Sequence, residues 1–125
     1  MDTRAKIIER AAAERIAGGD GARLTVVTGY FDPLTAAHAV RLAEIAATAE
    51  ALLVVVRTPE RPLLPARARA ELVAALSAVN HVVVEEGDIA WIAQLPSALL
   101  DGEEIADALR TRDLIVRVHQ RQAAG

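Results

Sequence analysis

Gly29-Tyr30-Phe31-Asp32-Pro33-Leu34-Thr35-Ala36-Ala37-His38 is the most informative stretch of this 125-residue chain. This Gly29–His38 segment follows the apolar run 24–28 and precedes an apolar pattern typical of a helix, with Thr35 as its N-cap. A glycine turn between a strand and a helix leaves backbone N–H groups available at the helix start. Such a site binds anions, and a nucleotide phosphate is the natural ligand, with His38 as a side-chain donor.

Strand and helix patterns alternate on both sides of this segment. Short apolar runs predict strands at 24–28, 52–56, 82–84, 98–100 and 114–118. Apolar residues at helical spacing predict helices at 3–17, at 35–49, from 65 onward, at 88–95 and at 103–110. The alternation predicts an α/β fold, a Rossmann-like parallel sheet of five strands with helices on both faces and right-handed crossovers.

The length suits one domain, which we expect to span residues 1–125. An N-terminal helix and turn occupy 1–21, the α/β core 22–119 and a tail 120–125. The chain is 53% hydrophobic and only 2% aromatic, so Ala, Leu, Val and Ile must build the core. The single tryptophan, Trp91, is expected to pack a short helix onto the sheet or to fill a subunit contact.

Charge and composition exclude several classes of protein. The net charge of −3, without a basic run, argues against nucleic-acid binding. Cysteine is absent, and His38, His81 and His119 lack a metal-ligand spacing, so we expect no protein-held metal site. No apolar run has transmembrane length and no signal peptide is evident, so we expect no membrane contact and a cytoplasmic location.

The Gly29–His38 segment resembles the HIGH-like signature of the nucleotidyltransferase superfamily. The matching residues are Gly29, Phe31, Asp32, Thr35 and His38. Stretches 61–65, 69–76 and 79–84 resemble the domain that adenylylates heptose 1-phosphate and its glycerol-phosphate cytidylyltransferase relatives. The resemblance spans nearly the whole chain, and its first motif is the most specific part.

The resemblance implies a nucleotidyl transfer. ATP or CTP with Mg²⁺ would lie over the motif, bound by Gly29, Tyr30, Phe31, Asp32, Thr35 and His38. A small phosphorylated substrate would attack the α-phosphorus and release pyrophosphate, with His38 as the catalytic donor to the phosphoryl oxygens. Further contacts to substrate or phosphate are expected from Arg57, Arg61, Asp101 and Gly102, the last two in a turn after the fourth strand.

Three features depart from the pattern of the family. Ala37 stands where the family has glycine, which adds a methyl group beside the phosphate path. The loop after the second strand is short and carries Arg57 and Arg61 instead of lysine, and the two side chains are not equivalent phosphate ligands. The Ser/Thr-rich second signature is missing, because Ser77 and Ser97 are the only serines.

Several residues also have simpler interpretations. Asp32 precedes Pro33 and is also an ordinary turn residue, although it could bind metal indirectly. Phe31 fits the core or a pocket wall, and Tyr30 could face either solvent or a substrate. Arg67 and Arg69 are interpreted as a solvated helix face, and His81 as a structural residue at the start of a strand.

Three functions therefore stay open. The first is an active nucleotidyltransferase, completed by a second subunit of a homodimer. The second is a non-catalytic nucleotide sensor or regulator, in effect a pseudoenzyme. The third is an assembly module whose N-terminal helix mediates dimers.

Overall fold

A computed structural model describes residues 2–19, 23–95 and 99–102. These residues form the 3-10 helix η1 (Thr3–Lys6) and the α-helices α1 (Arg10–Gly18), α2 (Ala36–Thr48), α3 (Ala66–Ala74) and α4 (Ala90–Ala93). The strands are β1 (Leu24–Gly29), β2 (Ala51–Val56), β3 (His81–Val84) and β4 (Leu99–Gly102). The predicted helix 103–110, the predicted fifth strand 114–118 and the tail 120–125 lie outside the described residues. Within the described ranges no helix is both long and apolar enough to cross a membrane.

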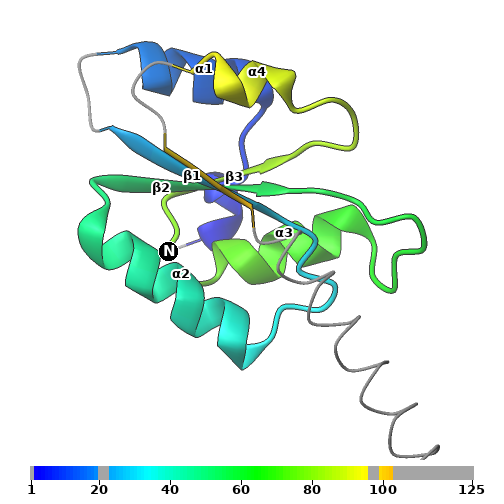
Figure 1. Ribbon diagram of the computed structural model, residues 1–125. Helices are drawn as coiled ribbons and strands as arrows, with labels where there is room; N and C mark the ends of the chain where they lie inside the picture. The colour runs from blue at the N-terminus through cyan, green and yellow to red at the C-terminus, as the bar shows by residue number, and fades with distance from the viewer. Residues whose placement is uncertain (1, 20–22, 96–98, 103–125) are drawn as a thin grey trace, which may run out of the picture.

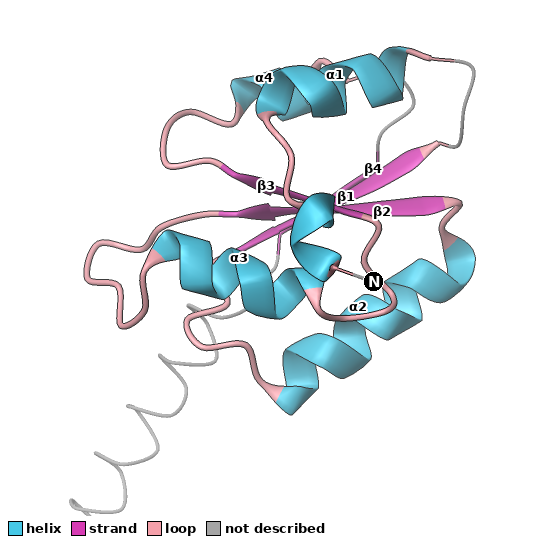
Figure 2. Ribbon diagram, turned by 180° about the vertical axis from the view of Figure 1, so that it is seen from behind, coloured by secondary structure: helices cyan, strands magenta, loops and turns pink. Residues whose placement is uncertain are grey.

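The four described strands form one parallel sheet in the order β3-β2-β1-β4. Helices α1 and α4 cover one face of this sheet, and α2 and α3 cover the other (Figure 1). The view from behind shows the same three layers (Figure 2). The predicted α/β class is confirmed, and the arrangement is consistent with a Rossmann-like fold.

The core divides into two clusters because successive side chains of a strand point to opposite faces. Val54 and Val56 of β2 pack beside α2 and α3, together with Phe31 and Val73. Leu53 and Val55 pack on the other face with α1 and α4. This two-sided burial explains why β2 is a continuous apolar run without polar residues between the apolar ones.

The predicted helix 3–17 is wrong in its middle. The chain is helical in η1 and α1, but Ile7 and Ile8 between them belong to neither helix, and Ile7 is extended. Ile7 forms a parallel bridge with Val82, and the Ile8 N–H donates to the Val82 carbonyl at 2.8 Å. Ile7 packs with the cluster beside α3 and Ile8 with the cluster beneath α1. The helix therefore breaks where the chain pairs with the edge strand β3 and sends one side chain to each core cluster.

Trp91 packs α4 onto the sheet, as the first of its two sequence interpretations predicts. The side chain is 7% exposed and belongs to the α1/α4 cluster. Its Nε1 donates to Glu85 Oε1 at 2.8 Å, and the Arg10 guanidinium lies 5.6 Å from the ring centroid. The polar edge of a mostly buried ring is therefore satisfied at the surface.

Candidate functional site

The carboxyl ends of β1 and β4 define the candidate site. From β1 the chain proceeds to β2 and β3 on one side of the sheet, and β4 joins on the other. Ligands of open parallel sheets bind at such a reversal of strand order, outside the carboxyl ends. The Gly29–His38 segment leaves the sheet at this point and leads into α2. The sequence motif and the strand order therefore indicate the same place, the carboxyl ends of β1 and β4.

Asp101 and Gly102 also lie at this edge, although not in the predicted turn. They belong to β4, in register with Val27 and Thr28 of β1. The predicted strand 98–100 ends too early, because pairing with β1 continues through residue 102. The prediction rested on a short apolar run, which does not show how far the backbone pairs with a neighbouring strand.

Thr35 and His38 build the start of α2. Thr35 is the N-cap, as predicted, and its Oγ1 accepts the His38 N–H at 3.3 Å. In return the Thr35 N–H donates to His38 Nδ1 at 3.0 Å. The histidine thus takes the place of the glutamate of a usual capping box. Because Nδ1 accepts a hydrogen bond, the neutral imidazole carries its proton on Nε2.

His38 is nearly buried, with 6% of its surface exposed. Its ring meets the Phe31 ring edge to face, with centroids 5.2 Å apart. Phe31 is fully buried and has a φ of 49°, in the left-handed region that side chains rarely adopt. Phe31 therefore belongs to the core, and its ring packs against the imidazole of His38. Ala37, the departure from glycine, is exposed in the same helical turn.

Asp32 binds the protein's own backbone. Its two carboxylate oxygens accept the N–H groups of Leu63 and Leu64 at 2.7 and 2.8 Å. These residues end the loop between β2 and α3, 31 and 32 positions away in the sequence. Asp32 therefore fastens a distant loop to the Gly29–His38 segment, a role that neither of its sequence interpretations included.

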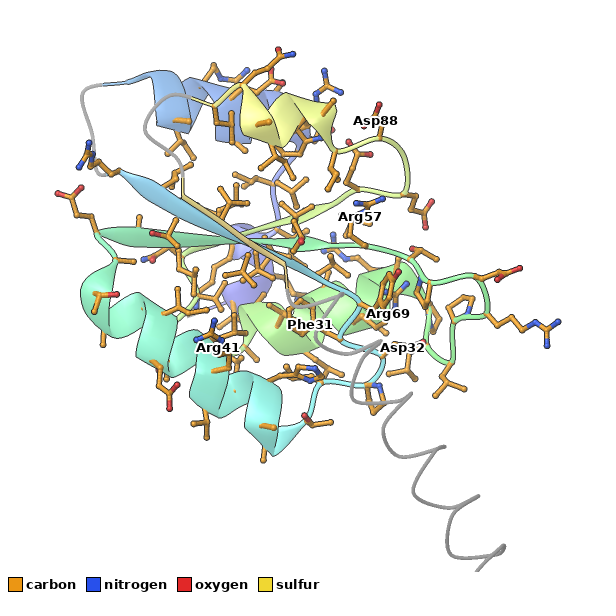
Figure 3. The ribbon with its side chains drawn as sticks, in the orientation of Figure 1. Phe31, Asp32, Arg41, Arg57, Arg69 and Asp88 are labelled. Carbon is orange, nitrogen blue, oxygen red and sulfur yellow. The ribbon has the colours of Figure 1, made fainter. Side chains whose placement is uncertain are left out.

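Arg69 is not part of a solvated helix face, and that prediction is wrong. Its side chain is fully buried and makes four hydrogen bonds. The acceptors are the carbonyls of Tyr30, Arg57 and Leu64 and the hydroxyl of Thr58. Figure 3 shows Arg69 among Phe31, Asp32 and Arg57 at the carboxyl end of the sheet.

The burial of Arg69 had a signal in the sequence. Arg69 precedes Val73 by four residues and Leu76 by seven, so it lies on the apolar face of α3. Leu72, in contrast, is 46% exposed. An arginine on a buried face requires hydrogen-bond acceptors there, and strand-end carbonyls supply them.

Arg57, Arg61 and Tyr30 were also predicted to contact nucleotide or substrate. The Nη2 of Arg57 donates to the Gly87 carbonyl at 3.2 Å, which directs the guanidinium toward the loop after β3. Arg61 is exposed in the loop before α3, and Tyr30 is half-buried. Among these three, only Tyr30 belongs to the Gly29–His38 segment.

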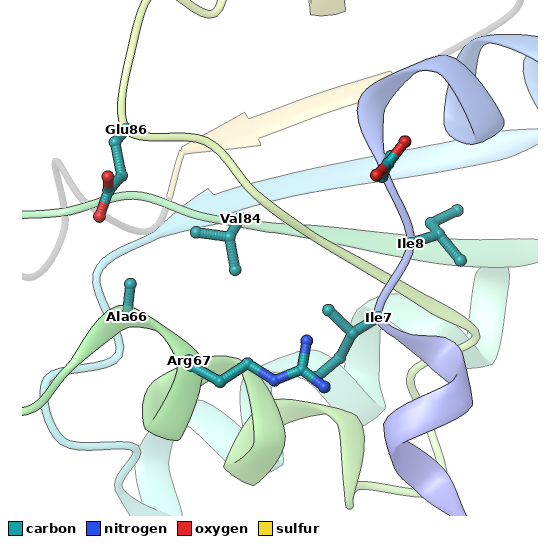
Figure 4. A pocket seen from close by; sticks show the side chains of 7 residues that line it. Ile7, Ile8, Ala66, Arg67, Val84 and Glu86 are labelled. Atoms are coloured by element: carbon teal, nitrogen blue, oxygen red, sulfur yellow. The ribbon is translucent and has the colours of Figure 1, made fainter.

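A hollow of about 560 Å³ lies elsewhere, beside the edge strand β3. Aliphatic side chains, one arginine and two carboxylates line this hollow (Figure 4). The lining residues are Ile7, Ile8, Glu9, Ala66, Arg67, Val84 and Glu86. Strands β2 and β3 separate this hollow from the carboxyl ends of β1 and β4, where the strand order reverses. In the described part of the chain, no group of three or more metal-ligating side chains is assembled.

Comparison with solved structures finds a protein of similar fold. The crystal structure of the lipopolysaccharide core biosynthesis protein from Thermoplasma volcanium GSS1 is 24% identical, with a TM-score of 0.54. The likeness covers 61% of this chain and 70% of that chain. No protein-family model and no curated protein matches the sequence. At this identity the likeness shows a shared fold alone.

Proposed function

We propose that this chain binds a nucleotide at the carboxyl ends of β1 and β4, with the phosphates at the start of α2. The observation that carries the proposal is the hydrogen bond from the Thr35 N–H to His38 Nδ1. It orients a nearly buried imidazole at a helix N-terminus and leaves Nε2 as the protonated nitrogen. Helix N–H groups, helix dipole and imidazole N–H all favour an anion at this position.

The reaction class that fits such a site is nucleotidyl transfer. A small phosphorylated substrate attacks the α-phosphorus of ATP or CTP, and pyrophosphate leaves. His38 stabilises the charge that develops on the phosphoryl oxygens, and no covalent intermediate is required. Mg²⁺ enters with the nucleotide, bound mainly through the phosphates. The structural likeness to a lipopolysaccharide core biosynthesis protein is in keeping with a biosynthetic role of this kind.

A non-catalytic nucleotide sensor is the second candidate. The hydrogen bonds of Asp32 and Arg57 favour this candidate, because both residues were predicted to contact the nucleotide, the substrate or a phosphate. Asp32 holds Leu63 and Leu64, and Arg57 contacts Gly87, so both act on the protein's own backbone. A site that binds nucleotide through His38 alone would still respond to nucleotide concentration.

Calorimetric titration with ATP and CTP in the presence of Mg²⁺ tests the proposal. The decisive variant is His38→Asn, whose side-chain oxygen keeps an acceptor near the position of Nδ1 but removes the donor at Nε2. We expect about tenfold weaker binding, the loss of one charge-assisted hydrogen bond. Val40→Ala, an exposed position on the same helix, is the matched control.

Three outcomes separate the candidate functions. Nucleotide binding with pyrophosphate release on addition of sugar or alditol phosphates supports an enzyme. Binding without release across that panel supports a sensor. Absence of nucleotide binding contradicts both, and a persistent dimer under those conditions supports the assembly module.

A further inference from the structure

Two charged side chains join the loop that follows β1 to the loop that follows β2. Asp32, in the first loop, accepts hydrogen bonds from Leu63 and Leu64 in the second. Arg69 Nη1 donates to the Tyr30 carbonyl at 2.9 Å and to the Arg57 carbonyl at 2.6 Å. Asp32 and Leu64 are 32 positions apart in the sequence, and Arg69 and Tyr30 are 39 positions apart.

Arg69 reaches three segments at once. Besides Tyr30 and Arg57, its Nε donates to the Leu64 carbonyl at 3.0 Å, and its Nη2 donates to Thr58 Oγ1 at 3.1 Å. All four acceptors are neutral oxygens, so a fully buried charge is stabilised by hydrogen bonds to dipoles. Its own helix is anchored in the core through Val73 and Ala74. The packing of α3 therefore fixes the position of the Arg69 side chain, and its four acceptors fix the orientation of the guanidinium.

The planar shape of the guanidinium matters for this arrangement. Its donors diverge in a fork, and the four acceptors come from separate stretches of backbone and side chain. A lysine ammonium carries the same charge but presents its donors from one point, so it cannot reach the same set. Loss of the fork removes the Arg69 partner from the Tyr30 and Arg57 carbonyls, and Asp32 then joins the two loops without the support of the guanidinium.

We propose that Arg69 and Asp32 are positioning residues that hold the β1–α2 loop and the 57–64 loop as one unit around the candidate site. The proposal rests on the proposed function for its ligand, but not for the coupling between the loops. Tyr30 and Asp32 belong to the segment that would bind nucleotide, so a shift of the 57–64 loop also shifts the entrance to α2. Neither residue contacts a reacting group, and each acts through the backbone that it holds.

Amide hydrogen exchange, followed by NMR in the free protein, tests the coupling. The informative amides are those of Leu63 and Leu64, which donate to Asp32 and not to Arg69. Arg69→Lys is expected to speed their exchange about tenfold, the effect of losing one hydrogen bond to a charged group. Arg67→Lys is the matched control, because Arg67 lies on the same helix but is exposed and pairs only with Glu71 among the described residues.

A milder variant keeps the test informative if Arg69→Lys does not fold. Thr58→Val removes one acceptor of Arg69 and leaves Asp32 and its partners in place. It should speed exchange of the same two amides about fivefold, since Arg69 loses one hydrogen bond. The long 3.4 Å bond from Thr58 Oγ1 to Glu86 Oε1 is lost as well, but it does not involve Asp32, Leu63 or Leu64. Unchanged exchange of Leu63 and Leu64 in a folded variant would overturn the proposal. An equal rise at the amides of β2 would also overturn it, because that pattern reports global destabilisation.

Titration of the same variants with Mg²⁺ and ATP tests the positioning role. We expect about tenfold weaker binding for Arg69→Lys and unchanged binding for Arg67→Lys. Altered loop exchange with an unchanged Kd would overturn the positioning role. If the wild-type protein binds no nucleotide, the proposed function fails, and the exchange rates alone decide whether the loops are coupled.

Discussion

Replacement of Phe31 should reverse the usual order of stability between alanine and glycine. Phe31 is fully buried, so removal of its ring costs about 3–5 kcal/mol in either variant through lost packing and a cavity. The two variants differ in the backbone, because Phe31 has a φ of 49°. A left-handed conformation costs a residue with a Cβ about 1–2 kcal/mol. Glycine avoids this cost but loses about 0.5–1 kcal/mol of chain entropy.

Phe31→Gly should therefore be more stable than Phe31→Ala by about 0.75 kcal/mol, the difference between the centres of those two ranges. Urea unfolding, followed by the fluorescence of the only tryptophan, Trp91, measures the difference. With a slope of about 2 kcal/mol/M, the urea midpoints should differ by roughly 0.4 M. An alanine variant as stable as the glycine variant, or more stable, would refute the reasoning.

A control shows the usual order at an ordinary position. Ala43 is exposed in the middle of α2, where the backbone is helical. Ala43→Gly should lower the free energy of unfolding by about 1 kcal/mol. Opposite signs at positions 31 and 43 would isolate the backbone conformation as the cause.

The remaining predictions concern a cap, a titrating side chain and a buried indole. Thr35→Ala should lower the free energy of unfolding by about 1 kcal/mol and Thr35→Ser by much less, measured by circular dichroism, because Thr35 caps α2. Burial lowers the pKa of His81 below its ordinary 6.5, so protons bind the unfolded chain better. Stability should fall as pH decreases from about 6.5 through the lower folded pKa, and His81→Gln should remove that part of the pH dependence of urea unfolding. Trp91→Phe should cost about 1 kcal/mol in thermal unfolding, and a double-mutant cycle with Glu85→Ala, which removes the acceptor, should assign this loss to their hydrogen bond.

Much of the fold follows from local patterns. The runs at 24–28 and 52–56 identify β1 and β2 to within one residue at each end, because buried parallel strands are continuous apolar stretches. The cap at Thr35 places the start of α2. The break at Ile7 and Ile8 could not be predicted, since it depends on pairing with Val82 about 75 positions later.

The candidate site is divided in the same way. Thr35 and His38 could be predicted as a pair, because residues three apart in a first helical turn face each other. The tautomer of His38 required the observed hydrogen bond. Asp32 and Arg69 were identified as charged residues, but their partners lie in loops that only folding brings together.

By itself, the sequence determined the α/β class, the main strands and the turn that leads into α2, because these depend on neighbours along the chain. Only the tertiary structure decided the strand order, the reversal between β1 and β4 and the union of two loops by Asp32 and Arg69. The physical reason is range. Helix caps and apolar periods act over a few residues, whereas a buried guanidinium takes its acceptors from wherever the fold places strand-end carbonyls.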